Sequence, residues 1–273
     1  MIASAIRAIG ASDAADVRDF LARKPYENVY LDWLLGQRRS LRDRLFCYRD
    51  ADRSIRGVAF YGRQTVLAAD SSEALDAFAE VAQNFPNERM IVAPRDVAHS
   101  FWERVQNWHR APRLLRDRQP VFVLRSCPQV LRPRVSVRRA HLSEAAEVAR
   151  NSAAMIEQEL EYDPRRVAGD FFENIDHMIA EGLWWVGTLN RRLCFFCHVG
   201  PTSRLTVQLQ GVWTPPSLRR HGVASDALGQ ICRHLLDEFP SISLYVNDFN
   251  SAAIALYRKI GFSEDGALAT YLF

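Results

Sequence analysis

Residues 214–224 read Thr-Pro-Pro-Ser-Leu-Arg-Arg-His-Gly-Val-Ala, and they separate a strand-like run from a helix-like run. The strand is predicted over 205–214, and the helix over 225–239, where apolar residues recur at helical spacing. The first N–H groups of a helix have no acceptor within the helix, and the helix dipole adds positive potential there. A strand, a glycine-bearing turn and a helix in this order therefore predict an anion-binding site.

The side chains of this turn suit a large anion. Arg219 and Arg220 add positive charge to that of the helix N-terminus. Gly222 and Ala224 carry little or no side chain, so a bulky polyphosphate can approach the backbone closely. We therefore interpret the turn as a pyrophosphate site.

The pattern around the turn predicts a mixed α/β (α+β) fold. A hairpin is expected across Asn190 and Arg191, and Gly261 is expected to end the last helix. Strands are predicted at 135–138, 183–189, 193–199, 205–214, 242–246 and 267–273, and helices at 142–151, 165–181, 225–239 and 251–260. Residues 155–163 are expected to form an acidic loop or a short helix. The result is a largely antiparallel sheet with one central crossover.

The first part of the chain repeats the start of the second. Residues 12–17, Ser-Asp-Ala-Ala-Asp-Val, match residues 143–148, Ser-Glu-Ala-Ala-Glu-Val. The preceding Ile6-Arg7 matches Val137-Arg138 at the same offset, which favours a duplication. Helices are predicted at 14–21, 26–36, 72–83 and 97–107, and strands at 45–48, 57–61, 90–93 and 119–124. Prolines near 127–134 predict a boundary between a domain over 1–130 and a domain over 134–273.

Two motifs in the second half carry a family resemblance. They are Arg219-x-x-Gly222-x-Ala224 and, further along, Asn250-x-x-Ala253-x-x-Leu256-Tyr257-x-Lys259-x-Gly261-Phe262. In this order they resemble the GNAT superfamily of acyl-CoA-dependent N-acetyltransferases, over about residues 135–273. The whole chain resembles the two-domain type, which has a degenerate GNAT-like N-terminal domain. The implied fold is a tandem of GNAT-like domains, each a mixed, mostly antiparallel twisted sheet flanked by helices.

The resemblance implies acetyl-CoA as co-substrate. Backbone N–H groups of the turn would hold the pyrophosphate, the end of the preceding strand would pair with the pantetheine arm, and a bulge there would open a slot for the thioester. The residues that it assigns to the co-substrate are Val212, Trp213, Thr214, Arg219, Arg220, His221, Gly222, Val223, Ala224, Ser225, Asn250 and Ala253.

Two side chains are candidates for proton transfer. The resemblance makes Tyr257 the general acid that protonates the departing thiolate of CoA. Many family members carry a glutamate base on the strand before the turn, but this strand carries Gln208 and Gln210. Glu159 or Glu161 of the acidic segment is then the candidate base, and Glu159 is our first choice. The base stays open, because an amine of lowered pKa needs little help.

Composition limits the partners. No apolar run approaches the roughly 20 residues that span a bilayer, and residues 1–10 lack the apolar core of a signal peptide. We therefore expect a cytoplasmic protein without a membrane partner. The net charge is +3, and no basic run is interleaved with aromatic residues, so no nucleic-acid partner is expected either. A homodimer is compatible with the sequence.

The five cysteines do not predict a metal site. An odd count without a signal peptide argues against a disulfide framework. Cys194 and Cys197 have the spacing of a zinc or redox pair, but a separation of three along a strand predicts thiols on opposite faces. No second pair follows, and we expect no metal.

The family resemblance, together with the anion-binding turn, implies an acetyl-CoA-dependent N-acetyltransferase that acetylates a primary amine by direct attack in a ternary complex. The alternative is a non-catalytic acyl-CoA-binding or sensor protein, favoured by the missing strand glutamate. The glycine motifs of dinucleotide-binding oxidoreductases and nucleoside triphosphatases are absent, as is the nucleophile elbow of hydrolases.

Overall fold

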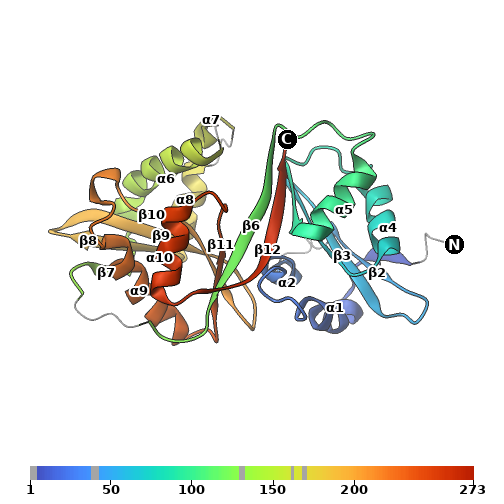
Figure 1. Cartoon of the computed structure of the whole chain (residues 1–273), viewed down its shortest axis with the longest axis horizontal. Coiled ribbons are helices and arrows are strands. Elements are labelled where there is room, and N and C mark those ends of the chain that lie inside the picture. Colours follow the sequence, from blue (N-terminus) through green and yellow to red (C-terminus); the bar gives the residue numbers. More distant parts are fainter. Residues whose placement is uncertain (1–4, 38–42, 129–132, 161–162, 168–170) are drawn as a thin grey trace.

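The computed structural model describes residues 5–37, 43–128, 133–160, 163–167 and 171–273. Two halves lie side by side, and each carries strands flanked by helices (Figure 1). The strands are β1 (Ile6–Ala8), β2 (Leu45–Arg49), β3 (Ile55–Tyr61), β4 (Gln64–Ala69), β5 (Met90–Pro94), β6 (Leu114–Leu124), β7 (Ser136–Arg139), β8 (Trp184–Leu189), β9 (Arg192–Thr202), β10 (Val207–Trp213), β11 (Ile242–Tyr245) and β12 (Ser263–Leu272). The helices are α1 (Ala14–Leu21), α2 (Val29–Leu35), α4 (Ser72–Ala82), α5 (Arg95–Val105), α6 (Ala145–Leu160), α7 (Pro164–Val167), α8 (Phe171–Ala180), α9 (Val223–Leu236) and α10 (Ser251–Ile260). None of these helices is long and apolar enough to cross a membrane.

The described strands form one sheet in the order β1-β2-β3-β4-β5-β12-β6-β11-β10-β9-β8-β7. Most neighbours are antiparallel, but β4 pairs with β5 and β10 with β11 in parallel. Parallel neighbours need a crossover, which α4 supplies in the first half and α9 in the second. The predicted mixed α/β class, with its central crossover, is confirmed, and the first half repeats that crossover.

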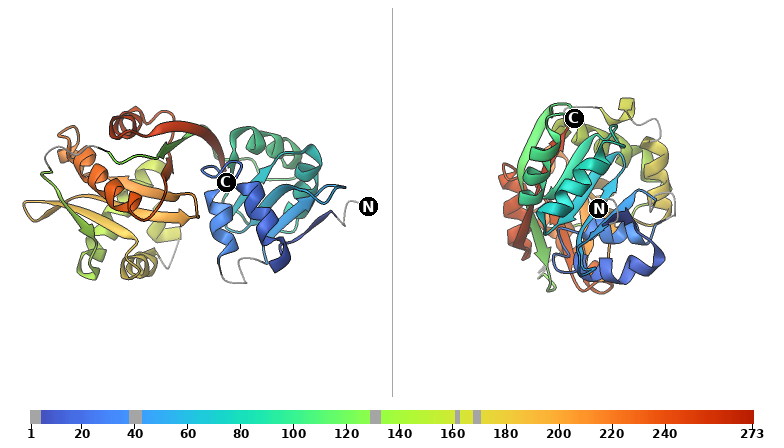
Figure 2. Two further views of the ribbon diagram at one scale, coloured as in Figure 1. Left: turned by 90° about the horizontal axis from the view of Figure 1, so that it is seen from below. Right: turned by 90° about the vertical axis from the view of Figure 1, so that its right-hand side faces the viewer.

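The two halves exchange one strand each at the centre of the sheet. β6 ends the first half in sequence but lies between β12 and β11, and β12 ends the second half but lies between β5 and β6. β12 therefore pairs with β5 as far as Leu272 opposite Met90. β6 pairs with β11 as far as Leu124 opposite Ile242. Figure 2 shows the two strands joining the halves.

The division into domains over 1–130 and 134–273 stays a prediction. Residues 129–132, where it falls, lie outside the described residues. The hydrogen bonds of β6 and β12 cross this division in both directions, so neither proposed domain has a complete sheet of its own.

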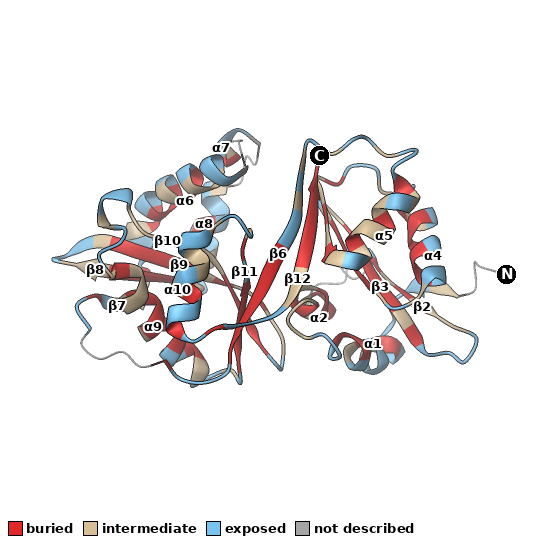
Figure 3. Ribbon diagram, in the orientation of Figure 1, coloured by how far each residue is buried: buried red, intermediate tan, exposed pale blue. Residues whose placement is uncertain are grey.

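Helices cover both faces of the sheet, because successive side chains of a strand point to opposite faces. Tyr61 of β3 packs with α4 and α5, whereas the preceding Phe60 packs with α1 and α2. In the second half, Phe195 of β9 packs with α9, and Phe196 packs with α6 and α8. The buried residues consequently follow the central strands between two helical layers (Figure 3).

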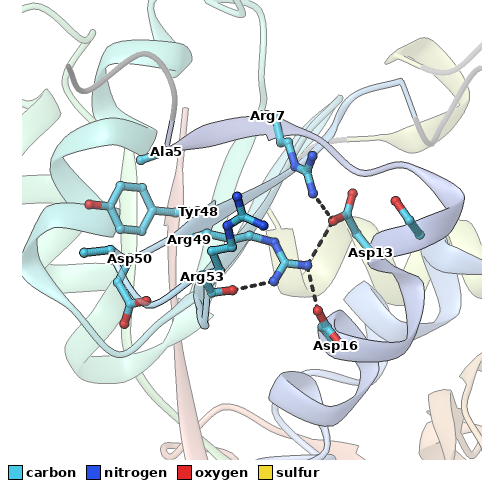
Figure 4. A pocket seen from close by; sticks show the side chains of 10 residues that line it. Ala5, Arg7, Asp13, Asp16, Tyr48, Arg49, Asp50 and Arg53 are labelled. Atoms are coloured by element: carbon cyan, nitrogen blue, oxygen red, sulfur yellow. Dashed lines mark hydrogen bonds and ion pairs between the residues drawn. The ribbon is translucent and has the colours of Figure 1, made fainter.

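An ion pair at the start of each half supports the internal repeat. Arg7 of β1 binds the buried Asp13 (Figure 4), and Arg138 of β7 binds Glu144 at 2.7 and 2.9 Å. In both halves the carboxylate also accepts the backbone N–H of the residue three positions earlier. The two halves therefore begin with the same strand-to-helix turn.

Several predicted elements differ from the observed ones. The predicted helix over 142–151 becomes α6, which continues through residue 160, so most of the acidic segment is helical rather than a loop. Residues 145–160 contain neither glycine nor proline, and their alanine, methionine, glutamate and glutamine favour a helix. The helix predicted over 165–181 is replaced by α7 and α8, with residues 168–170 outside the described part. β4 was not predicted.

Two turns agree with their predictions. Asn190 and Arg191 have φ values of 52° and 63°, which suit the tight turn of the β8–β9 hairpin. Gly261 ends α10 with a φ of 111°, a conformation that costs glycine little.

The exchanged strands predict that the two halves cannot be separated. A fragment of residues 134–273 lacks β6, so β11 and β12 lose the strand that lies between them and expose unpaired edges. We expect this fragment to aggregate when expressed alone and to become soluble when co-expressed with residues 1–133. Size-exclusion chromatography measures both outcomes. A monomeric fragment that unfolds cooperatively on its own would contradict the expectation.

Candidate active site

A slot opens in the sheet where β10 and β11 separate. The two strands pair only at Val207 opposite Ile242 and at the next residue of each. Beyond that point the chain after β11 turns to β6, since the N–H of Val246 donates to the carbonyl of Pro120 at 3.2 Å. Among the described strands, none pairs with the carboxyl end of β10 on that side.

A bulge in β10 accompanies the separation. Its register against β9 shifts between Gln210 and Trp213, and Gly211 between them has a φ of 61°. A Cβ at this glycine would lie 3.0 Å from the ring of His198, so a side chain would be both strained and crowded. The family resemblance implies a bulge at this strand end, and one is present.

A cleft of about 930 Å³ extends from the slot over the start of α9 and along α10. The predicted site residues that line it are Val212, Trp213, Thr214, Arg219, Arg220, Gly222, Ala224, Ser225, Asn250, Ala253, Tyr257 and Glu159. Val223 instead packs into the core, and the exposed His221 lies outside the lining. The structure thus brings most of the predicted residues to one cavity.

The N-terminus of α9 presents free backbone N–H groups to this cleft. Gly222 precedes the helix with a φ of 80°, and no side chain caps the helix start. In the described part of the chain, no protein acceptor is found for the N–H groups of residues 220–225. The corresponding helix of the first half differs, because the Ser71 hydroxyl accepts the N–H of Ala74 at 3.1 Å and caps α4. Only α9 of this pair is therefore open to an anion.

Arg134 supports the turn, although the sequence analysis did not assign it a role. Its guanidinium donates to the carbonyl of His221 at 2.9 Å and lies against Gly222. The carboxylate of Asp226, in the first turn of α9, accepts the backbone N–H groups of Arg134 and Val135. The segment before β7 is thereby tied to the anion-binding turn, and it adds a third arginine there.

The residues present fit an acyl-CoA. The Thr214 hydroxyl is shielded from solvent at the end of β10 and has no hydrogen-bond partner among the described residues. Gly222 has no side chain, and a Cβ there would come within 3.1 Å of the Arg134 guanidinium. The backbone is therefore uncovered where a diphosphate would approach. The polar groups at the end of β10 suit the pantetheine arm of an acyl-CoA, and the cationic groups at the start of α9 suit its diphosphate.

Tyr257 lies on α10 with its side chain 6% exposed, and it lines the cleft. Burial raises the pKa of its phenol well above the usual range, and the nearby charge of Glu159 raises it further. The phenol is therefore protonated at neutral pH, as a proton donor must be.

Glu159 comes from the last turn of α6 and faces the same cleft. The surrounding protein raises the pKa of its carboxyl, and the positive charge of Arg116 partly opposes this. Glu157, two residues earlier and exposed like Glu159, lies 4.0 Å from Arg165 and does not line the cleft. The other candidate base, Glu161, lies outside the described residues.

Four further polar side chains near the cleft have partners within the protein. Gln210 donates to Gln208 at 2.9 Å, so the two strand amides bind each other. His198 is half-buried with its ring against that of Trp184, and desolvation by the surrounding protein lowers its pKa to about 4, so the imidazole is neutral. The side chain of Asn250 caps α10 by accepting the N–H of Ala253 at 3.2 Å, while it also lines the cleft.

Sequence reasoning missed two further residues of the cleft wall. Arg116 of β6 reaches the cleft from the first half, and Asn247 reaches it from the loop after β11. The amide of Gln119, also on β6, donates to the side chain of Asn247 at 3.0 Å. No local pattern marks these residues, because strand exchange alone brings β6 to this place.

A second cavity, of about 850 Å³, lies at β1 and β2 of the first half. Figure 4 shows Arg7 and Arg49 converging on Asp13, while Arg49 also reaches Asp16 and the carbonyl of Arg53. The charges of Arg7, Arg49, Asp13 and Asp16 are thus paired with one another.

The cysteines follow a different arrangement from the predicted one. A register shift between β8 and β9 at Gly187 adds a residue to β9, and Cys194 shares one apolar cluster with Cys197. The prediction of thiols on opposite faces was therefore wrong. Burial raises the pKa of both thiols. Among the described residues, no group of three or more His, Cys, Asp or Glu side chains is placed to hold a metal ion.

Comparisons with known families agree with this geometry. Residues 150–262 match the model of the Acetyltransferase (GNAT) family, and residues 44–148 match a domain of unknown function, DUF4081. No curated protein sequence matches the chain.

Solved structures share the fold of the whole chain. A Drosophila protein has a TM-score of 0.66 at 14% identity, covering 98% of each chain. An acetyltransferase of the GNAT family from Colwellia psychrerythraea has a TM-score of 0.58 at 10% identity, covering 98% of this chain and 99% of its own. A tandem GNAT protein from the clavulanic acid biosynthesis pathway has a TM-score of 0.56 at 12% identity, covering 98% of each chain. Residues 150–262 therefore match the GNAT acetyltransferase family, and the whole chain shares the fold of a tandem GNAT protein.

Proposed function

We propose that this protein is an acetyl-CoA-dependent N-acetyltransferase that transfers acetyl to a primary amine in a ternary complex. The observation that carries the proposal is the uncapped N-terminus of α9, which opens onto the slot between β10 and β11. The match of residues 150–262 to an acetyltransferase family supports the group transferred. The amine acceptor, rather than a hydroxyl or a thiol, is the finer part of the proposal.

The chain's own groups would bind acetyl-CoA along the cleft. N–H groups of residues 220–225 would hold the diphosphate, with Arg219 and Arg220 adding positive charge. The free edge of β10 at Val212–Thr214 would pair with the amide groups of the pantetheine arm. An N–H at the bulge would stabilise negative charge that develops on the thioester oxygen.

Two side chains would move the protons of the reaction. The amine nitrogen attacks the thioester carbonyl carbon, an N–C bond forms and the C–S bond breaks. Tyr257 donates its proton to the departing sulfur, and Glu159 accepts the proton that the nitrogen loses, directly or through water. A buried, protonated phenol and a carboxyl in the same cleft support this pairing of acid and base.

A second candidate function is acyl-CoA binding without turnover. The mutual hydrogen bond of Gln208 and Gln210 favours it, since these amides stand where many family members have a base and cannot accept a proton from an amine. Location and assembly stay expectations: the sequence predicts a cytoplasmic protein without a nucleic-acid partner, and a homodimer is compatible with it.

Replacing Tyr257 by phenylalanine tests the acid and the activity together. We expect Tyr257→Phe to lower kcat for amine-dependent CoA release by roughly 100- to 10,000-fold, because the sulfur would leave without its proton donor. Binding of acetyl-CoA, measured by calorimetry, should persist. Tyr245→Phe is the matched control, since Tyr245 also senses the charge of Glu159 but lies outside the cleft lining. Full turnover in Tyr257→Phe removes the acid role. Wild-type binding without release from any amine favours the second candidate.

The pH dependence of the rate tests the base. A base works only when deprotonated, so the wild-type rate should fall as the pH drops through the pKa of Glu159, which the cleft raises above its usual value of 4.5. Glu159→Gln should lose this acidic limb and be slower at neutral pH. Glu157→Gln, at a residue outside the cleft lining, should keep the acidic limb. An unchanged acidic limb in Glu159→Gln would assign the proton to another acceptor.

A further inference from the structure

We propose that the amine acceptor carries a carboxylate, and that Arg116 of the first half binds it. This inference rests on the proposed function, and it names the class of acceptor: amines of the amino-acid type rather than simple alkylamines.

The strand exchange places Arg116 in the cleft. β6 pairs with β12 along most of its length, and Arg116 lies opposite Thr270. With β11, however, β6 pairs only from Val121 onward. Before Val121, the edge of β6 that faces the second half has no strand partner among the described residues. Arg116 on this edge instead contacts Phe249, in the loop after β11, and Glu159, at the end of α6. Arg116 therefore lies at the acceptor end of the cleft, away from the start of α9 that would hold the diphosphate.

Its guanidinium is held in place but not neutralised by the described residues. One terminal nitrogen donates to the backbone carbonyl of Glu159, and the group lies over the ring of Phe249, 4.8 Å from its centre. The Nε–H is shielded from solvent and has no hydrogen-bond partner among the described residues. No described carboxylate lies within 4.0 Å of it. A planar group with several free N–H donors is well suited to a carboxylate.

The opposite charge stands at the same end of the cleft. The carboxyl of Glu159 lines the same cavity and senses the charge of Arg116, yet the two side chains form no ion pair. A carboxylate that would receive the proton of an amine and a guanidinium that is free to bind an anion thus face one space. An acceptor with both an amino and a carboxylate group complements this pair.

The first half also fixes the wall beside Arg116. The Thr270 hydroxyl donates to the amide oxygen of Gln119 at 2.5 Å, and Gln119 in turn donates to Asn247. This chain of hydrogen bonds runs from β12 across β6 to the cleft and orients the Asn247 amide. The geometry gives the first half a direct part in acceptor choice without a co-substrate site of its own.

The experiment compares matched acceptors by CoA release from acetyl-CoA. The pairs are leucine with 3-methylbutylamine and phenylalanine with 2-phenylethylamine, which differ only in the carboxylate, and leucine with leucinamide, which differ in its charge. Each is measured with wild type, Arg116→Gln and Arg118→Gln. Arg118 is the matched control, because it lies two residues along β6 and pairs with Glu264 outside the cleft lining.

We expect Arg116→Gln to lower the ratio of kcat/KM between the carboxylate-bearing and carboxylate-free acceptor by about 10- to 100-fold. Because each ratio is compared with that of wild type, intrinsic differences in amine reactivity cancel. The KM for acetyl-CoA should not change, and Arg118→Gln should keep the wild-type ratio. If Arg116→Gln does not fold, Arg116→Lys and the wild-type preference for leucine over leucinamide carry the test.

An unchanged ratio in Arg116→Gln, or no wild-type preference for the carboxylate, overturns the inference while leaving N-acetyl transfer intact. If acetyl-CoA binds and no acceptor of either kind releases CoA, the proposed function itself fails, and the inference fails with it.

Discussion

The antiparallel pairing of β6 with β12 is the interaction on which the rest of the structure depends. It runs from Leu114 opposite Leu272 to Val123 opposite Ser263 and joins the ends of two halves that each lack a strand. Backbone N–H and C=O groups at a sheet edge need partners, and each half finds them in the strand of the other. The two halves therefore share a single continuous sheet rather than forming two independent ones.

The two halves differ at the start of their crossover helices. Both contain a parallel crossover, but Ser71 caps α4, whereas Gly222 leaves α9 uncapped beside three arginines. Asp70, in the turn before α4, also binds Arg23 at 3.1 Å, so that turn carries its own anion. The second half keeps an anion-binding helix start, and the first half supplies β6, with Arg116, to the wall of the same cleft. In the proposed mechanism, the second half would bind the co-substrate and the first half would take part in the choice of acceptor.

The sequence predicts those features that depend on neighbours along the chain. Residues 219–224 and 250–262 indicate the co-substrate turn and α10, and the matching Arg7 and Arg138 segments indicate the repeat. It does not predict strand exchange, because the partner of a strand is set by contacts far away in sequence; Arg116 was missed for the same reason. The thiol of Cys194 was misplaced because one residue of bulge reverses the faces that follow.

Hydrogen–deuterium exchange with and without acetyl-CoA tests the central claim most directly, which is one co-substrate site per chain, at the start of α9. The account predicts that acetyl-CoA slows exchange at the amides of residues 220–225. Exchange at the corresponding turn, residues 69–74, should not change. Gly222→Glu should abolish the effect, because it adds an anion at a φ of 80° beside Arg134. Protection at 69–74, or none at 220–225 in the wild type, would contradict it.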